Sequence, residues 1–139
     1  MKNTKNLLLA IGITVFGFGI SAHEGEDHDA PSMVQAPKGG TIKSLEQTHV
    51  EVLVKGKDIK IYLYDKELKP QSVNGYVVSA KVQMPRSKKS EAIVLTARDQ
   101  SFEASFDAKG MHRYTLHLAV KDPKTGHDDK LKYNIEPKK

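Results

Sequence analysis

Residues 112–120 of this 139-residue chain read His-Arg-Tyr-Thr-Leu-His-Leu-Ala-Val, the clearest alternation of apolar and polar side chains in the sequence. Every second position from Tyr114 to Val120 is apolar, and the positions between them are polar or small. A period of two is typical of a β-strand, because successive side chains of a strand point to opposite faces. The stretch therefore predicts a strand with one face in a core and the other toward solvent.

Six further segments with alternating apolar residues lie between turn-forming residues. We expect strands at residues 50–54, 59–63, 76–84, 92–97, 102–106 and 131–135. Lys55-Gly56-Lys57-Asp58 joins the first two into a hairpin, and Pro85 ends the third. Seven short strands in about 90 residues predict an all-β fold, a seven-stranded antiparallel immunoglobulin-like sandwich. A small open barrel is the alternative, because alternation alone does not distinguish a barrel from a sandwich.

The first 22 residues predict a secretory signal peptide. Lys2 and Lys5 provide a positive start, and residues 7–20 contain no charge. Ser21 and Ala22 are small residues, and cleavage after either of them fits the pattern. An uncleaved anchor helix is the alternative, but the uncharged stretch is shorter than the ~20 apolar residues that a membrane span requires. We therefore expect export to a bacterial periplasm with no membrane span after cleavage, and the absence of cysteine fits an oxidising compartment.

After the signal peptide we expect a flexible leader at residues 23–40 and a β-sandwich domain at residues 41–139. The leader has proline and glycine residues and almost no apolar side chains to bury. Residues 23–37 contain four Asp+Glu and no Lys or Arg, a net charge of −4. Residues 38–139 contain 20 Lys+Arg and 13 Asp+Glu, a net charge of +7. The total of +5 thus combines +2 from Lys2 and Lys5 of the predicted signal peptide, −4 from the acidic leader and +7 from the basic domain.

Composition argues against two classes of function. An exported protein meets no genomic DNA, and the basic residues are scattered through predicted strands and turns, so we expect no nucleic-acid partner. The chain has no cysteine, no Gly-x-Ser-x-Gly elbow, no phosphate-binding glycine loop and no His-Glu-x-x-His motif. We therefore expect that the protein is not an enzyme.

Residues 23–29, directly after the predicted cleavage site, read His-Glu-Gly-Glu-Asp-His-Asp. The imidazole nitrogens of His23 and His28 suit Zn²⁺, Cu²⁺ and Ni²⁺, and carboxylates such as that of Glu26 can complete the coordination. If cleavage follows Ala22, the free α-amino group of His23 can join its imidazole in a chelate that favours Cu²⁺. The alternative is an acidic, solubilising leader that contains two histidines by chance. A metal site here has modest affinity, because unstructured ligands must be ordered on binding.

A second candidate metal site uses residues of the predicted strands. His49 opens the first strand, Met84 ends the third, and Met111 and His112 open the sixth. If these side chains meet at one end of a sandwich, methionine sulfur and histidine nitrogen form a set that favours Cu(I). The alternative is that His112 is a half-buried residue at the edge of the core and that the methionines fill space.

Two other histidines are weaker candidates. His117 lies on the exposed side of its strand, which is typical of a surface histidine. His127 precedes Asp128 and Asp129 at a polar hairpin tip, a pattern that favours a solvated turn over an accessory set of metal ligands.

Several motifs resemble a small exported β-domain found alone or fused to the periplasmic adaptor (membrane fusion) proteins of heavy-metal efflux pumps. The motifs are Pro37-Lys38-Gly39-Gly40, Thr48-His49-Val50-Glu51-Val52 and Ile59-Lys60-Ile61-Tyr62-Leu63-Tyr64-Asp65. Two later motifs resemble related immunoglobulin-like domains of periplasmic proteins linked to copper handling: Lys81-Val82-Gln83-Met84-Pro85 and Gly110-Met111-His112-Arg113-Tyr114.

This resemblance covers about residues 37–136 and implies a metal-associated role, with His49 as the one potential ligand inside the opening motif. The chain lacks the hairpin and lipoyl parts of a pump adaptor. It also lacks the Trp-plus-two-Met arrangement of small copper-chaperone barrels. The resemblance therefore implies neither of those two roles.

The sequence thus predicts a soluble periplasmic protein that binds Cu, Zn or Ni in heavy-metal homeostasis or efflux. The predicted ligands are His23, Glu26 and His28 in the leader, with His49 and His112 as candidates for a structured site. The alternative is a non-catalytic protein-interaction module of an envelope complex, in which an exposed strand edge pairs with a partner and metal binding is incidental or absent.

Overall fold

Nine β-strands and no helix make up the described part of the chain, residues 34–137 of the computed structural model. In chain order they are β1 (Thr41–Ser44), β2 (His49–Lys55), β3 (Asp58–Tyr64), β4 (Val77–Gln83), β5 (Ser90–Ile93), β6 (Thr96–Arg98), β7 (Ser101–Ser105), β8 (Tyr114–Lys121) and β9 (Asp128–Ile135). No helix within these residues is long and apolar enough to cross a membrane. The predicted signal peptide and residues 23–33 of the predicted leader lie outside the described residues.

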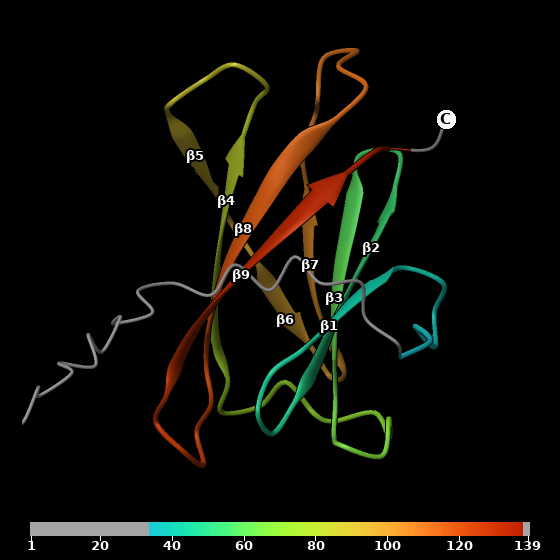
Figure 1. Cartoon of the computed structure of the whole chain (residues 1–139), viewed down its shortest axis with the longest axis vertical. Helices are drawn as coiled ribbons and strands as arrows, with labels where there is room; N and C mark the ends of the chain where they lie inside the picture. The colour runs from blue at the N-terminus through green and yellow to red at the C-terminus, as the bar shows by residue number, and fades with distance from the viewer. Residues whose placement is uncertain (1–33, 138–139) are drawn as a thin grey trace, which may run out of the picture.

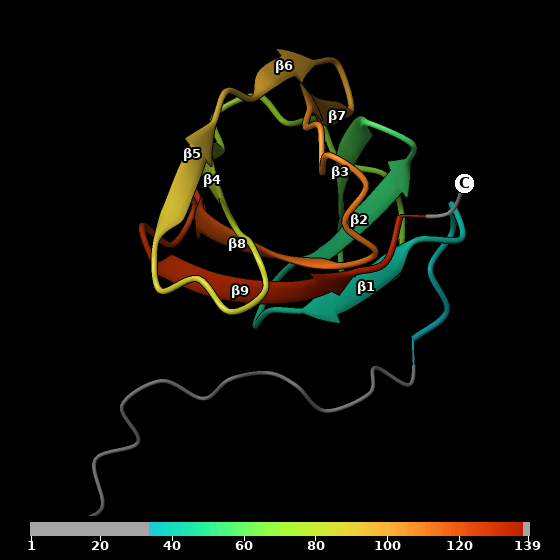
Figure 2. The same ribbon diagram turned by 90° about the horizontal axis from the view of Figure 1, so that it is seen from above.

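The strands form two sheets in which every pairing is antiparallel (Figure 1). One sheet has the order β1-β2-β3-β7-β6, and the other has the order β5-β4-β8-β9. Seen from above, the two sheets face each other, with β1 beside β9 at one margin and β6 beside β5 at the other (Figure 2). The predicted all-β architecture of two packed antiparallel sheets is confirmed.

The predicted number of seven strands is wrong for two reasons. β1 is an additional strand of four residues, too short to show a period of two, and pairing with β2 holds it in place. The expected strand at residues 92–97 is divided, because β5 pairs with β4 in one sheet and β6 pairs with β7 in the other. The chain crosses between the sheets at Val94, whose side chain is 85% exposed, and Leu95, which packs against the core.

The core lies between the sheets and is built from the apolar side chains whose alternation predicts the strands. Its buried members are Val50, Val52, Ile59, Ile61, Leu63, Val73, Ala80, Val82, Phe102, Tyr114, Leu116, Leu118, Val120, Leu131, Tyr133 and Ile135. Each fully buried large aliphatic or aromatic side chain contributes roughly 1.5–3 kcal/mol through removal of apolar surface from water. The hydroxyl of Tyr133 on β9 donates a 2.7 Å hydrogen bond to the carbonyl of Val50 on β2, so one buried side chain joins the two sheets directly.

The turns gather at two opposite ends of the sandwich (Figure 1). The end that carries His112, called the His112 end below, contains the β2–β3 and β4–β5 turns and the β7–β8 connection. The opposite end, called the His49 end, contains the β1–β2 turn, the β3–β4 connection and the β8–β9 turn. This division decides which candidate ligands can meet.

Candidate functional site

His49 lies on the outer face of β2, as its position in the alternation predicts, yet its side chain is only 8% exposed. Its Nδ1 lies 2.7 Å from Oγ of Ser44 on β1, and its Nε2 lies 3.4 Å from the carbonyl oxygen of Lys66. A carbonyl oxygen only accepts, so in the neutral ring the Nε2–H donates to Lys66 and Nδ1 accepts from the Ser44 hydroxyl. Both ring nitrogens are therefore engaged within the fold.

His112 lies in the β7–β8 connection with an exposed side chain. Met111 beside it is 43% exposed, and Met84 at the end of β4 is partly buried against the core. These three residues share the His112 end, whereas His49 lies at the other. The eight residues of β8 run between the two ends, about 25 Å at the rise of a strand. The structure therefore does not bring His49 and His112 together on one ion.

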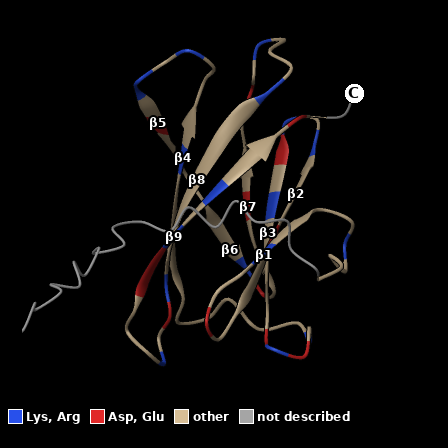
Figure 3. Cartoon of the chain, in the orientation of Figure 1, with Lys and Arg blue, Asp and Glu red and all other residues tan. Residues whose placement is uncertain are grey.

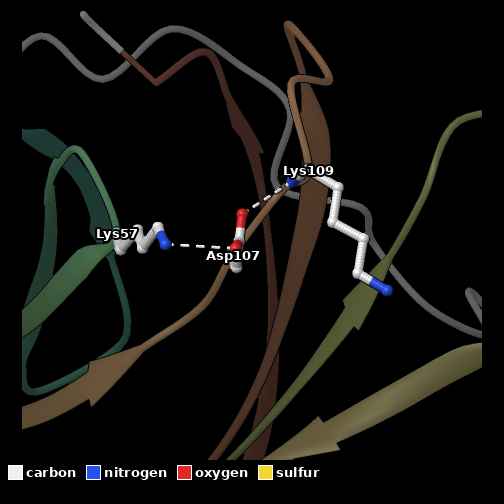
Figure 4. Close-up of polar contacts among 3 residues, drawn as sticks. All are labelled: Lys57, Asp107 and Lys109. Carbon is white, nitrogen blue, oxygen red and sulfur yellow. Dashed lines mark hydrogen bonds and ion pairs between the residues drawn. The ribbon is translucent and has the colours of Figure 1, made fainter.

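Asp107 fixes the start of the connection that carries His112 (Figure 4). Its Oδ1 accepts a 2.8 Å hydrogen bond from the backbone N–H of Lys109, and its Oδ2 lies 3.1 Å from Nζ of Lys57 in the β2–β3 turn. The Lys109 N–H, and after it the Lys57 ammonium, hold the pKa of this carboxyl below its usual range. The backbone N–H of Phe106 also donates to the carbonyl of Lys57 at 2.8 Å. These contacts join two turns of the His112 end.

The remaining histidines of the described domain lie apart from one another. His117 is on the outer face of β8, and its Nε2 lies 2.9 Å from Oε1 of Gln83. The Gln83 amide nitrogen donates to the carbonyl of Ser87 at 2.6 Å, so its Oε1 accepts the Nε2–H of His117. His127 is exposed in the β8–β9 turn at the His49 end. Across residues 34–137, no three His, Cys, Asp or Glu side chains are grouped so that they could hold a metal ion.

The predicted leader ligands His23, Glu26 and His28 lie outside the described residues. What the structure does describe is the point at which the chain leading from them joins the sandwich. At this point the backbone is bonded to the buried carboxylate of Glu51, a contact that the sequence analysis did not predict.

Glu51 lies on the outer face of β2 with 0% of its surface exposed. Its Oε1 accepts hydrogen bonds from the backbone N–H groups of Lys38 (3.0 Å) and Gly40 (2.8 Å). Its Oε2 accepts a 2.7 Å hydrogen bond from the hydroxyl of Tyr64, and burial together with this bond raises the pKa of Tyr64. Hydrogen bonds to a charged group contribute roughly 1.5–3 kcal/mol each, so three donors offset the cost of burying the carboxylate.

The glycine pair allows the backbone to reach this carboxylate. The N–H of Gly39 donates to the carbonyl of Ala36 at 3.1 Å, and Gly39 has a φ of +80°, which glycine adopts at little cost. A side chain at Gly40 would collide with the carbonyl of Val52 and approach Oε1 of Glu51. The last residues of the predicted flexible leader are therefore bonded to the sandwich.

These contacts involve residues of the first three motifs on which the family resemblance depends. The glycine pair, His49, Glu51 and Tyr64 all take part in the contacts just described. Asp65 closes the β3–β4 connection, because its Oδ1 accepts the backbone N–H groups of Glu67 (2.9 Å) and Lys69 (2.8 Å). In this chain these three motifs hold the fold at the outer face of β2 and at the end of β3. A carboxylate between two valines, eleven residues after a glycine pair, is the sequence signal that could have revealed this cluster.

Comparison with known proteins assigns no family and no function to the chain. No protein-family model, no curated protein and no solved structure matches the chain.

Proposed function

We propose that this is an exported, periplasmic metal-binding protein with an immunoglobulin-like sandwich, acting in heavy-metal homeostasis or efflux. The observation that carries the proposal is the sequence of residues 23–29, two imidazoles and four carboxylates directly after a predicted signal peptide. The assignment to heavy-metal handling rests on the resemblance stated above.

The strand order supports the immunoglobulin-like assignment. Without β1, the sheets read β2-β3-β7-β6 and β5-β4-β8-β9. This order corresponds to strands A-B-E-D and C′-C-F-G of an immunoglobulin domain. β1 then lies outside strand A as an added edge strand, positioned by the contact of residues 38–40 with Glu51.

The distribution of histidines supports metal capture by the leader. The nitrogens of His49 are both engaged in the fold, and His112 and His127 are single exposed imidazoles at opposite ends. We therefore assign Cu, Zn or Ni as cargo to His23, Glu26 and His28, with His112 as a separate accessible imidazole. In this role the sandwich anchors the ligand segment through Glu51.

Calorimetric titration of the chain from residue 23 onward with Cu²⁺, Zn²⁺ and Ni²⁺ tests this proposal. We expect at least one ion to bind more tightly than about 10⁻⁴ M, an affinity worth roughly 5.5 kcal/mol. His23→Ala/His28→Ala should weaken binding about tenfold or more, whereas the matched control His112→Ala/His127→Ala should leave it unchanged. Absence of binding in this range, or a loss confined to the control variant, contradicts the proposal.

A second candidate function, a protein-interaction module of an envelope complex, is favoured by a separate feature. β9 is an eight-residue edge strand, and a groove of about 800 Å³ runs beside its end, lined by residues 38–41, 52–56 and 134–136. An edge strand with an adjoining groove can accept an additional strand from a partner.

Deletion of residues 23–33 distinguishes the two functions, because it removes the predicted ligands and keeps the Lys38 and Gly40 contacts to Glu51. Under the metal proposal, cells that export this variant lose tolerance to the bound metal, measured as growth across a metal series. Under the interaction alternative the deletion is harmless, and reversal of a charge on the edge strand β9, such as Lys132→Glu, is damaging instead.

A further inference from the structure

The outer face of the β5-β4-β8-β9 sheet carries a concentration of positive charge. Lys81 of β4, His117 of β8 and Lys132 of β9 are direct cross-strand neighbours in one row. Lys130 lies in the next row along β9. In Figure 3, blue segments that mark Lys and Arg are visible on β4 and β9 of this sheet. We call Lys81, His117, Lys130 and Lys132 the basic face.

The acidic residues of the same sheet are displaced from this face. Three of the four outward-facing rows across β4, β8 and β9 contain no Asp or Glu: Gln83-Thr115-Asn134, Lys81-His117-Lys132 and Ser79-Ala119-Lys130. Asp128 enters only at the end of the sheet, opposite Lys121. The ion pairs found within residues 34–137 join Lys57, Lys60 and Arg98 to carboxylates elsewhere. Lys81 and Lys132 flank His117 with no carboxylate between them, so an anionic chain lying across these strands would meet positive charge on both sides of the imidazole.

The basic face also forms a shallow groove. It has a volume of about 540 Å³ and is lined by residues of β4, β8 and β9 together with Ser90. The hydrogen bond from His117 to Gln83 fixes the imidazole at its centre. The lysine ammonium groups around it are strongly hydrated point charges on flexible stems, which suit a carboxylate-rich chain lying across the strands.

The acidic segment of this same chain has the matching charge and the necessary reach. Residues 23–37 have a net charge of −4, with every acid between residues 24 and 29. Lys38, where the chain is tied to Glu51, lines the same groove as Asn134 and Glu136 at the end of β9. Lys38 lies nine positions after Asp29 in the sequence, a span of up to about 30 Å when the chain is extended. Lys132 lies two residues from Asn134, and Lys81 is about 10 Å farther across two strand spacings.

We propose that residues 23–29 bind across the basic face, with the carboxylates of Glu24, Glu26, Asp27 and Asp29 paired to Lys81, Lys130 and Lys132. Because residues 23–29 belong to the same chain as the basic face, the contact is intramolecular. The effective concentration of the segment at the face is on the order of millimolar, a concentration at which a free acidic peptide would have to be added to compete. Each exposed ion pair is weak and screened by salt, so the contact forms at low ionic strength and dissociates at high ionic strength. It requires no metal and goes beyond the proposed function.

A spin label in the leader tests this contact. The chain has no cysteine, so Gly25→Cys provides a single attachment point in the chain from residue 23 onward. In chelator and low salt, we expect selective broadening of the amide NMR signals of Lys81, His117 and Lys132. The broadening should disappear at high salt and in the variant Lys81→Gln/Lys132→Gln.

Two comparisons make the result decisive. Lys60→Gln/Arg98→Gln removes the same charge from the other sheet, beside Glu103, and should leave the broadening intact. A mixture of spin-labelled protein without ¹⁵N and ¹⁵N-enriched protein without the spin label should give no broadening. Broadening in that mixture would assign the contact to a second copy and overturn the proposal. In the singly labelled protein alone, uniform broadening of all signals or no broadening at all would overturn it as well. Because metal is absent throughout, failure here leaves the calorimetric test of metal binding unaffected.

Discussion

Replacing Glu51 by alanine is expected to lower the free energy of unfolding by about 3–5 kcal/mol, the range found when one partner of a buried charged network is removed. The substitution leaves the Tyr64 hydroxyl and the N–H groups of Lys38 and Gly40 without their acceptor at a fully buried position. It also creates a cavity at the outer face of β2. For a domain of this size the loss corresponds to a fall in melting temperature of about 12 °C or more.

Urea unfolding followed by circular dichroism measures this loss. Glu51→Gln should cost less than Glu51→Ala, because its amide oxygen still accepts one or two of the hydrogen bonds. Glu46→Ala, at an exposed position of the β1–β2 turn, is the matched control and should change stability by less than about 0.5 kcal/mol. A loss below about 1 kcal/mol for Glu51→Ala would mean that the buried carboxylate does not hold residues 38–40 in solution.

Raising the pH above about 10 is expected to destabilise the domain steeply, because three tyrosines are buried as neutral phenols. Burial raises the pKa of Tyr114 to about 12. Burial raises the pKa of Tyr64 and Tyr133 as well, with further contributions from Glu51. In the unfolded chain a tyrosine ionises near pH 10, so the unfolded state binds fewer protons above that pH. The stabilisation is complete below pH 10 and is lost as the pH rises toward the folded-state values, by roughly 1.4 kcal/mol per pH unit for each such tyrosine.

Unfolding curves in urea between pH 8 and 11.5, with tyrosinate absorbance recorded alongside, check this dependence. Tyr114→Phe retains the ring that packs edge-on against Phe106 at 5.0 Å between centroids. Its slope above pH 10 should be shallower than that of the unsubstituted protein by the contribution of one tyrosine. Identical slopes for the two proteins would show that Tyr114 titrates normally in the folded state.

The alternation of apolar residues predicted most of the fold, because burial on one face of a strand leaves a period of two in the sequence. The clearest stretch, at residues 112–120, corresponds to β8, and all four of its apolar positions from Tyr114 to Val120 are buried. The crossing at Val94 and Leu95 was missed, since a strand that changes sheets keeps extended backbone and apolar residues while its pairing partner changes. Strand pairing depends on residues far apart in the sequence, so the local period of two does not show which strands pair.

The candidate site shows the same division between local and distant information. The alternation of Val50, Val52 and Val54 places His49 on the outward side of its strand, but it does not show that Ser44 and Lys66 contact the ring there. It also could not reveal that β2 and β8 begin at opposite ends, which separates His49 from His112. Glu51 was overlooked for a related reason: an acid at an outward position suggests solvent exposure, and the groups that enclose it come from residues 38–40 and from Tyr64.

The groove shared by Lys38 and Glu136 has a consequence for modularity. Lys38 before β1 and Glu136 after β9 line the same groove, and β1 and β9 lie side by side at one margin of the two sheets (Figure 2). Domains whose ends lie close together can be inserted into a loop of another protein without stretching the host. The closeness of these two segments would therefore allow the sandwich to be joined to a larger protein before β1 and after β9 without separating the two strands.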